Sequence, residues 1–401
     1  MSKDLVNYFE SFLQKEPLFK DKSVLQSDYT PDILKHREKQ TDIIAQILAP
    51  ALRINKPSNL FLYGKTGTGK TVTTKYTINK FIEVAESKNI PVKALYVNCK
   101  LKRVADTEYR LIAQLVRELG VEIPVTGLPT EEVYDQFFKL VDEKKQIIIL
   151  ILDEIDQLVE KAGDEILYSL TRMNSELKNA KISCIGISNN LVFAHTLDPR
   201  IKSSLSQEEI VFSPYNAIQL VDILSQRAKR AFNKDVLKSG VIEKCSAYAA
   251  REHGDARRAL ELLRVSGEIA ERNGDKHVEI KHIDKAEEKI EKDNIIESVE
   301  NQPKQFHSVL YSIFLISDKS DGTIHTGEVY ELYKSICKKT NVRPLTQRRV
   351  SDIIGELDML GIINAKTISK GRYGRTREIS VIIPKNICEK INKILKDNLE
   401  I

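Results

Sequence analysis

Short apolar runs alternate with helical periodicity along the first half of the chain. The runs fall at residues 59–63, 92–98, 147–152 and 182–187, and amphipathic stretches separate them. Runs of this length between helical segments are typical of parallel strands that crossover helices cover on both faces. The pattern predicts an α/β domain with a parallel sheet over residues 1–213.

The residues before the first run predict a helix that begins near residue 30. Thr30 stands where a helix N-cap is expected, and Pro31 suits the first helical turn. Apolar residues such as Leu34, Ile44 and Leu48 follow at helical spacing. We therefore expect a helix ahead of the first strand.

The pattern changes after Ser213-Pro214. Apolar residues then recur only at helical spacing as far as residue 298, which predicts a small helical domain over residues 214–300. The polar stretch around residues 300–305 contains a proline and predicts a linker.

The last part of the chain, residues 301–401, predicts a third domain. Three amphipathic helices are expected at 305–317, 325–340 and 345–360, and residues 365–383 predict two strands around a basic tip that contains glycine. Three helices followed by a hairpin indicate a winged helix-turn-helix.

The first strand leads directly into the pattern Gly-x-x-x-x-Gly-Lys-Thr, and a helical stretch follows it. This strand–loop–helix context is the one that a P-loop needs. Glycines let the backbone turn its N–H groups toward phosphate oxygens, the lysine reaches the β- and γ-phosphates, and the threonine hydroxyl binds Mg²⁺. The predicted ATP-binding residues are Gly64, Lys65, Thr66, Gly67, Thr68, Gly69, Lys70, Thr71 and, in the following helix, Thr73.

The apolar run at 147–152 ends in Asp153-Glu154. At the carboxyl end of a buried strand, Asp153 is placed to hold the Mg²⁺ shell together with Thr71, and Glu154 to polarise the attacking water. The next strand ends at Ser188, and Asn189 after it is expected to orient water near the γ-phosphate.

Two arginines are candidates for contacts with the terminal phosphate. Arg257 lies in the first turn of a helix after Gly254-Asp255, where the helix dipole disfavours a cation unless a phosphate is bound. Arg258 is expected to face solvent. Arg200 follows Asp198-Pro199 and is expected to act on the ATP of a neighbouring protomer, as an arginine finger does.

Composition narrows the function classes. No apolar stretch approaches the roughly 20 residues that span a bilayer, and the five cysteines at 99, 184, 245, 337 and 388 form no Cys-x-x-Cys pair. We expect a soluble, cytoplasmic, nucleoid-associated protein without a membrane partner. Residues 301–401 hold 17 Lys and Arg against 11 Asp and Glu, whereas residues 1–300 hold 45 against 46. This asymmetry suggests an anionic polymer as partner of the last domain.

The ordered motifs GKTGTGKT, LDEID, SNN, DPR and GDARRAL resemble those of an AAA+ ATPase. With HREKQ near the N-terminus and a C-terminal winged helix, the chain resembles the archaeal origin-recognition and helicase-loader family, which is kin to the eukaryotic origin-recognition subunits and the cell-division-cycle loader. The resemblance covers nearly the whole chain.

The resemblance implies sites that the residues alone do not predict. In that family the segment matching Tyr29 to Gln40 lies against the adenine, whereas by itself His36-Arg37-Glu38 is typical of a solvated helix face. The family also inserts a DNA-contacting helix after the second strand, within "CKLKRVADTEY" here. The added candidates are Tyr29, His36, Arg37 and Tyr215 for the nucleotide and Lys102 and Arg103 for DNA.

A winged helix on such a core predicts ATP-gated binding of duplex DNA. The helix at 345–360 is expected to enter the major groove by its N-terminal turns, and the wing tip to meet the minor groove or phosphates. The candidate DNA contacts are Thr346, Gln347, Arg348 and Arg349 on the helix and Lys370, Arg372, Tyr373 and Arg375 on the wing.

We interpret the sequence as an initiator that recognises replication origins, recruits or loads an MCM-type helicase, meets other initiator protomers on DNA, and hydrolyses ATP slowly as a switch. A hexameric branch-migration motor and an ATP-dependent transcription regulator stay open as alternatives, as does a winged helix that contacts protein. The origin sequence, the paralogue within the family and the oligomeric state on DNA are open as well.

Overall fold

The computed structural model describes residues 16–100, 107–124, 127–193, 197–205, 207–318, 324–369 and 375–401. They form two compact units, Met1–Ile283 and Asp284–Ile401. The boundary between them falls within helix α13 (Ile280–Glu300), whereas the predicted domain boundaries lie near residues 213 and 300.

The first unit is built on a five-stranded parallel sheet with the order β2-β3-β4-β1-β5. The predicted parallel α/β fold is therefore confirmed. In this order the carboxyl ends of β3, β4 and β1 lie side by side, which brings the residues that follow these strands to one edge of the sheet. The strands are β1 (Asn59–Tyr63), β2 (Val92–Asn98), β3 (Ile147–Asp153), β4 (Lys181–Ser188) and β5 (Gln207–Val211).

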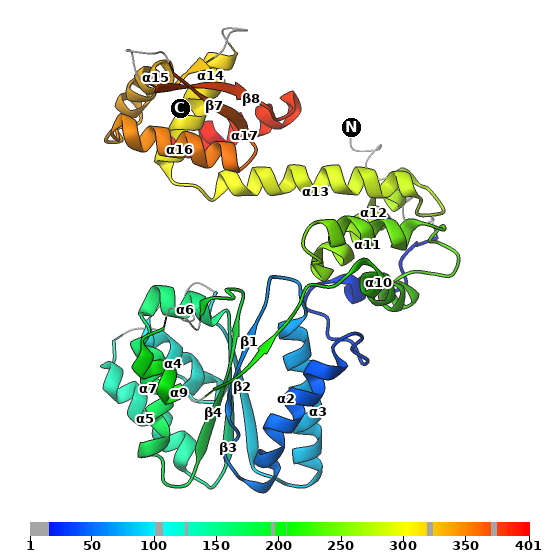
Figure 1. Cartoon of the computed structure of the whole chain (residues 1–401), viewed down its shortest axis with the longest axis vertical. Helices are drawn as coiled ribbons and strands as arrows, with labels where there is room; N and C mark the ends of the chain where they lie inside the picture. Colours follow the sequence, from blue (N-terminus) through cyan, green and yellow to red (C-terminus); the bar gives the residue numbers. More distant parts are fainter. Residues whose placement is uncertain are drawn as a thin grey trace, which may run out of the picture. The chain divides into compact units, whose positions relative to one another are not determined.

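Helices cover both faces of this sheet (Figure 1). Successive side chains of β3 point to opposite faces: Ile147 and Ile149 pack in one cluster with residues of α2 and α3, and Ile148 and Leu150 pack in the other with residues of α4, α5 and α7. Burial on both faces explains why β3 is apolar at six consecutive positions. The helices are α2 (Glu38–Leu48), the short η2 (Ala49–Arg53), α3 (Lys70–Ser87), α4 (Glu108–Glu118), α5 (Thr130–Asp142), α6 (Ile155–Ala162), α7 (Glu165–Glu176) and α9 (Pro199–Leu205).

The prediction of a helix beginning at Thr30 was wrong, because α2 begins at Glu38. The residues before it pack against the helical part of the unit instead: Phe19 stacks on Phe232 with ring centres 4.5 Å apart, and the missing side chain of Gly267 leaves room for the Phe19 ring. Beside Thr30, Arg227 donates to the Tyr29 carbonyl and Arg230 pairs with Asp32, and these tertiary contacts outweigh the local helix signal of Thr30-Pro31.

The helical part begins after Ser213-Pro214, as predicted, although strand β5 just before it was not expected. It consists of α10 (Ala217–Ala231), α11 (Val241–Arg251), α12 (Ala256–Asn273) and the start of α13. Asp255 caps α12, because its carboxylate accepts hydrogen bonds from the N–H groups of Arg257 and Arg258, and Gly254 turns the chain with a φ of 68°. The short helix η1 (Lys22–Leu25) of the N-terminal segment packs on α10 and α12.

The second unit is a winged helix, as predicted. Its strands form a small antiparallel sheet in the order β6-β8-β7. The apolar residues Val350, Ile353, Ile354 and Leu357 of α16 are all buried, which agrees with the amphipathic helix expected at 345–360. The elements are α14 (Lys304–Ser317), β6 (Ile324–His325), α15 (Thr326–Lys339), α16 (Gln347–Met359), β7 (Ile363–Ser369), β8 (Arg375–Val381) and α17 (Lys385–Leu399).

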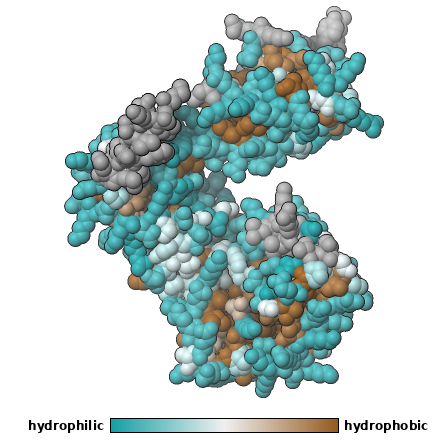
Figure 2. Space-filling view, turned by 180° about the vertical axis from the view of Figure 1, so that it is seen from behind, coloured by the Kyte–Doolittle hydropathy of each residue, from teal (hydrophilic) through white to brown (hydrophobic). Residues whose placement is uncertain are grey.

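Helix α14 differs from the amphipathic helix expected at 305–317. It is buried at every position from Phe306 to Phe314, because α15, α16 and α17 all pack against it. Helix α17 was not predicted, and its Ile387, Ile391 and Leu395 complete this core. On the side seen in Figure 2, hydrophilic side chains cover most of each unit. Within the described ranges, no helix is both long and apolar enough to cross a membrane.

Candidate functional site

The loop between β1 and α3 closes tightly at Gly67 and Gly69, whose φ angles are 72° and 89°. These angles disfavour any other residue, and the surroundings add a second reason for glycine. A Cβ at Gly67 would lie 1.7 Å from a carboxylate oxygen of Asp255, and one at Gly69 would lie 2.5 Å from the Tyr215 hydroxyl. The loop is therefore packed directly against the turn before α12 and the segment before α10.

Lys70 begins α3 and is 5% exposed. Its ammonium donates hydrogen bonds to the carbonyls of Gly64 (2.7 Å) and Lys65 (2.9 Å) and to the Asn189 side-chain oxygen (2.8 Å). Burial lowers the pKa of Lys70 to about 8, although the nearby carboxylates of Asp153 and Glu154 act in the opposite direction. The cation is thus held at the mouth of the loop by acceptors that an anionic phosphate can replace.

The predicted acidic edge lies next to this lysine. One Asp153 oxygen accepts hydrogen bonds from the Thr71 hydroxyl (2.9 Å) and the Tyr96 hydroxyl (2.7 Å). The next residue, Glu154, has a left-handed backbone with φ of 58° and accepts a 2.6 Å hydrogen bond from the Asn189 amide. Asn189 therefore joins Lys70 and Glu154 through its two amide atoms.

A pocket opens over these groups, entirely within the first unit. One wall comes from residues 26–31 and 33–35 of the N-terminal segment, another from the loop and the acidic edge, and a third from α10 and α12 through residues such as Ile223, Gln226 and Leu260. The predicted residues that line it are Tyr29, Gly67, Gly69, Lys70, Thr71, Asp153, Glu154, Asn189, Tyr215 and Arg257.

Other predicted nucleotide residues lie around the pocket without lining it. The hydroxyls of Thr68 and Thr73 donate to the carbonyls of Lys65 (2.8 Å) and Gly69 (2.7 Å), so they shape the loop from within. The side chains of Lys65 and Thr66 are exposed. Gly64 packs against Phe212.

The HREKQ segment departs most from its expectation as a solvated helix face. His36 has a positive φ of 62° and its ring lies 2.9 Å from the Asp222 carboxylate on α10. Arg37 is 4% exposed and lies behind the loop, where its guanidinium donates to the carbonyls of Thr68 and Ser213. Neither side chain lines the pocket.

The structure places Arg200 as exposed, in keeping with its predicted role, but Arg258 differs from its prediction. Arg200 is 86% exposed at its side chain and pairs with Asp198, outside its own pocket. The expectation that Arg258 faces solvent was wrong: its side chain is 11% exposed and pairs with Glu252 at 3.1 Å. The ion pair packs Arg258 against the turn before α12, while Arg257 is left exposed on the pocket side.

Three residues at the site were not predicted from the sequence: Tyr96, Lys75 and Arg227. Tyr96 on β2 contacts Asp153, and its own ring carries the Lys75 ammonium 4.4 Å above it. Arg227 on α10 is 7% exposed, stacks 4.4 Å from the Tyr29 ring centre and donates to the Tyr29 carbonyl at 3.2 Å. Burial lowers the pKa of Arg227 to about 10. The sequence could have predicted the burial of Arg227, because helical spacing places it among apolar neighbours.

In the second unit, the four predicted residues at the start of α16 are exposed. Thr346 caps the helix by accepting the N–H of Arg349 at 3.4 Å, and the Arg349 guanidinium lies 3.4 Å from Glu356. Arg348 shares the exposed first turn. Arg377 on β8 was not predicted: it donates to the Ser351 carbonyl at 3.1 Å and so ties the hairpin to α16.

Most of the other predicted DNA contacts lie outside the described residues. These are Lys102 and Arg103 in the first unit and Lys370, Arg372 and Tyr373 at the wing tip. Arg375 is the first residue of β8 and pairs with Ser369 of β7, which places it at the tip end of the hairpin.

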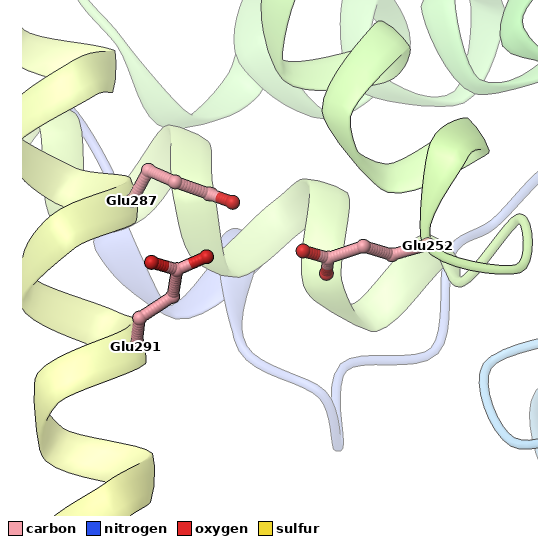
Figure 3. Close-up of side chains that lie close together, drawn as sticks. All are labelled: Glu252, Glu287 and Glu291. Carbon is pink, nitrogen blue, oxygen red and sulfur yellow. The ribbon is translucent and has the colours of Figure 1, made fainter. Parts of the chain in front are cut away.

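Figure 3 shows three acidic side chains that do not belong to the pocket. Glu252 follows α11, and Glu287 and Glu291 lie one turn apart on α13. Like charges one turn apart on a helix repel each other by a few tenths of a kcal/mol. Glu291 is exposed and Glu252 already pairs with Arg258, and we assign the three no ligand.

Three family models match the chain. An AAA domain matches residues 54–192, a Cdc6 AAA+ ATPase-type lid domain residues 221–288, and a CDC6 C-terminal winged helix domain residues 297–391. The three matches follow one another in the order in which the sheet, the helical part and the winged helix occur.

The chain is also similar to proteins from archaea along nearly its whole length. It is 54% identical over 375 residues to an ORC1-type DNA replication protein of Pyrococcus abyssi, covering 92% of this chain and 89% of the relative. The corresponding protein of Pyrococcus furiosus is 53% identical, with 97% and 92% covered. Among solved structures, the ORC1 protein of Aeropyrum pernix in complex with DNA is 44% identical with a TM-score of 0.82, covering 96% of this chain and 98% of that one.

Proposed function

The chain belongs to the family of ORC1-type DNA replication proteins, and we propose that it is an ATP-regulated initiator that binds origin duplex DNA and helps to recruit or load the replicative helicase. The observation that carries the proposal is the combination of a P-loop pocket walled by lid helices with a winged helix whose cationic first turn is exposed, in a chain 54% identical to an ORC1-type relative.

The pocket suits a nucleoside triphosphate with Mg²⁺. The Thr71 hydroxyl and the Asp153 carboxylate converge to 2.9 Å and are the hard oxygen ligands that Mg²⁺ prefers. When bound, the ion neutralises charge on the β- and γ-phosphates. We propose that these two residues hold it and that the Lys70 ammonium exchanges its carbonyl acceptors for phosphate oxygens.

Hydrolysis needs a base near the γ-phosphate, and Glu154 stands beside Asn189 at that end of the pocket. While the Asn189 amide donates to the Glu154 carboxylate, the oxygen that it contacts is occupied and does not accept a hydrogen bond from the attacking water. We propose that this hydrogen bond restrains turnover, so that ATPase activity is slow and the nucleotide acts as a switch. Arg257, exposed on the pocket side of α12, then senses the terminal phosphate for the lid.

Duplex DNA is the proposed partner of the second unit. The similar Aeropyrum pernix ORC1 protein was solved in complex with DNA. In this chain Gln347, Arg348 and Arg349 are exposed at the start of α16, the end of a recognition helix that reads base edges. The wing residues would contact phosphates or the minor groove, and Lys102 and Arg103 would add a contact from the first unit.

The remaining parts of the proposal concern organisation. We propose three functional parts with boundaries near residues 213 and 300, although the compact units divide at residue 283. Exposed and outside its own pocket, Arg200 suits a finger that enters a neighbouring protomer's site. An MCM-type helicase and other initiator protomers on nucleoid DNA complete the set of proposed partners.

A salt titration of DNA affinity tests the DNA part, with origin and random duplexes and two sets of variants. Removing the wing residues Arg372 and Arg375 should weaken binding to both duplexes alike. The slope of log affinity against log salt concentration should become shallower by up to about two units. Arg348→Ala should cost more on the origin, because an arginine on a guanine edge is worth roughly 1–3 kcal/mol of discrimination.

If all of these variants keep the DNA affinity of the wild type, the winged helix is a protein-contact module. Genome-wide mapping of bound sites tests the biological role. Sites at replication start points support an initiator, sites at promoters support a transcription regulator, and continuous DNA-stimulated ATP turnover by a closed ring supports a branch-migration motor.

A further inference from the structure

Arg37 is buried to 4% exposure in a stretch of otherwise polar, accessible residues. Its Nε donates to the Thr68 carbonyl at 3.0 Å and one terminal nitrogen donates to the Ser213 carbonyl at 2.6 Å. The guanidinium also lies 3.9 Å from the centre of the Tyr215 ring. A guanidinium that is bonded on two sides and stacked on a third is fixed in one position.

We infer that Arg37 positions the P-loop amide of Gly69 for phosphate binding. The peptide between Thr68 and Gly69 is trans and planar, so its carbonyl and its N–H point in opposite directions. Because Arg37 holds the Thr68 carbonyl on the outer side of the loop, the Gly69 N–H faces the inner side. In agreement, Gly69 lines the pocket whereas Thr68 does not.

The preceding peptide is held in the same way from the lid. The N–H of Ala256, in the first turn of α12, donates to the Gly67 carbonyl at 3.1 Å. By the same planarity the Thr68 N–H is turned away from α12. Arg37 and α12 thus fix two successive loop carbonyls, and the Gly69 donor that this arrangement aims into the pocket binds a phosphate without the cost of reorganisation.

Arg37 links this loop to the segment that leads into the lid. Ser213 and Tyr215, two of the other partners of Arg37, lie between β5 and α10. The Tyr215 N–H donates in turn to the Gly254 carbonyl before α12, at 3.3 Å. A displacement of this segment therefore removes a hydrogen bond and the ring contact from the same side chain that aims the Gly69 amide.

The role differs from the adenine contact that the resemblance implied for this segment. A residue that aims a phosphate-binding amide should affect every ligand with a polyphosphate, whatever its base. A residue that touches the base should affect the preference between bases. Phosphate ligands without a base therefore separate the two roles.

The test measures the affinity of the full chain for ADP, GDP and inorganic tripolyphosphate. Arg37→Met keeps the length of the side chain but removes its donors, and Arg37→Lys keeps the charge with a single donor group that cannot reach both carbonyls. We expect Arg37→Met to weaken the binding of ADP and of tripolyphosphate by the same factor. The expected factor is about tenfold, which corresponds to the loss of one charge-assisted hydrogen bond. The ratio of ADP to GDP affinity should stay at its wild-type value, and Arg37→Lys should fall between.

Arg117→Met is the matched control. Arg117 is a partly buried arginine on α4 that donates to the backbone carbonyl of Ile123 at 3.4 Å, away from the pocket. It should lose stability but bind all three ligands as the wild type does. Thermal unfolding of each variant shows that the binding measurements are made on folded protein.

Three results would overturn the inference. One is an Arg37→Met protein that is less stable but binds tripolyphosphate with wild-type affinity, which would make the residue purely structural. Another is a loss confined to ADP with a changed ADP to GDP ratio, which would place Arg37 at the base. The third is an equal loss in Arg117→Met. The inference rests on the proposed nucleotide site, and a wild-type chain that bound neither ADP nor tripolyphosphate would refute that site instead.

Discussion

Raising the pH from 7 to 9 should weaken ADP binding about tenfold, because Lys70 loses its proton in this range. Its pKa of about 8 in the folded protein is set mainly by burial. By the titration equation about nine tenths of these lysines are protonated at pH 7 and about one tenth at pH 9. A phosphate ligand binds the ammonium form, so at pH 9 it must first restore the proton, at a cost of about 1.4 kcal/mol.

The sign follows from the direction of the shift. The folded pKa of Lys70 lies below the unfolded value of 10.5, so the protonated form is disfavoured in the nucleotide-free protein. This unfavourable contribution to folding is fully present below pH 8 and disappears as the pH rises to 10.5. Bound polyphosphate raises the pKa again, and binding is therefore strongest below pH 8.

Isothermal titration calorimetry with ADP at pH 7, 8 and 9 checks this directly. Measurements without Mg²⁺ exclude metal effects, and two buffers with different ionisation enthalpies count the protons taken up. Uptake should rise from about 0.1 proton at pH 7 to about 0.9 at pH 9. An affinity that is constant over this range, with no proton uptake at pH 9, would refute the assignment of a neutral Lys70 amine at high pH.

Three further predictions address the other groups of the site. Glu154→Ala should retain ATP binding but lose hydrolysis, measured by filter binding and phosphate release, whereas Lys70→Ala should lose ATP binding; an unchanged ATPase rate in Glu154→Ala contradicts the role given to that carboxylate. Mixing Arg200→Ala with Glu154→Ala protein should restore some turnover, since one protomer offers the acid and its neighbour the finger; no recovery at any ratio, with a wild-type rate independent of concentration, removes the trans assignment. Tyr96→Phe should raise the Mg²⁺ concentration needed for tight ATP binding about tenfold, because groups that orient a metal ligand are typically worth that much; an unchanged requirement shows that the 2.7 Å contact with Asp153 does not orient it.

The parts of the fold that could be predicted are those encoded by neighbouring residues. The P-loop, the Asp153-Glu154 strand end and the Asp255 cap each need only a few consecutive positions, and strand burial on both faces leaves a plain apolar run. Strand β5 was missed because Glu208 and Glu209 interrupt it, which is tolerated at the edge of the sheet next to β1 alone.

The missed groups depend on contacts between distant residues. Tyr96 contacts Asp153 because β2 and β3 are neighbours, which the spacing along the chain does not specify. Arg37 lies in a sequence typical of a solvated helix, yet it is buried, because its guanidinium packs between the loop carbonyl of Thr68 and that of Ser213 before the lid. A local sequence pattern does not predict which backbone carbonyls accept hydrogen bonds from a buried arginine.

The packing of the N-terminal segment on the lid has a consequence for synthesis of the chain. The Leu18 N–H donates to Glu271, and Phe19 stacks on Phe232. On a ribosome the segment emerges first, and its partners follow more than 200 residues later, after roughly 10–50 s at typical elongation rates. During that interval the P-loop can form, but residues 26–35 lack the lid helices against which they pack in the folded protein. A nascent chain stalled before α12 should therefore hold nucleotide weakly, and tight retention should begin once the lid helices have left the ribosome.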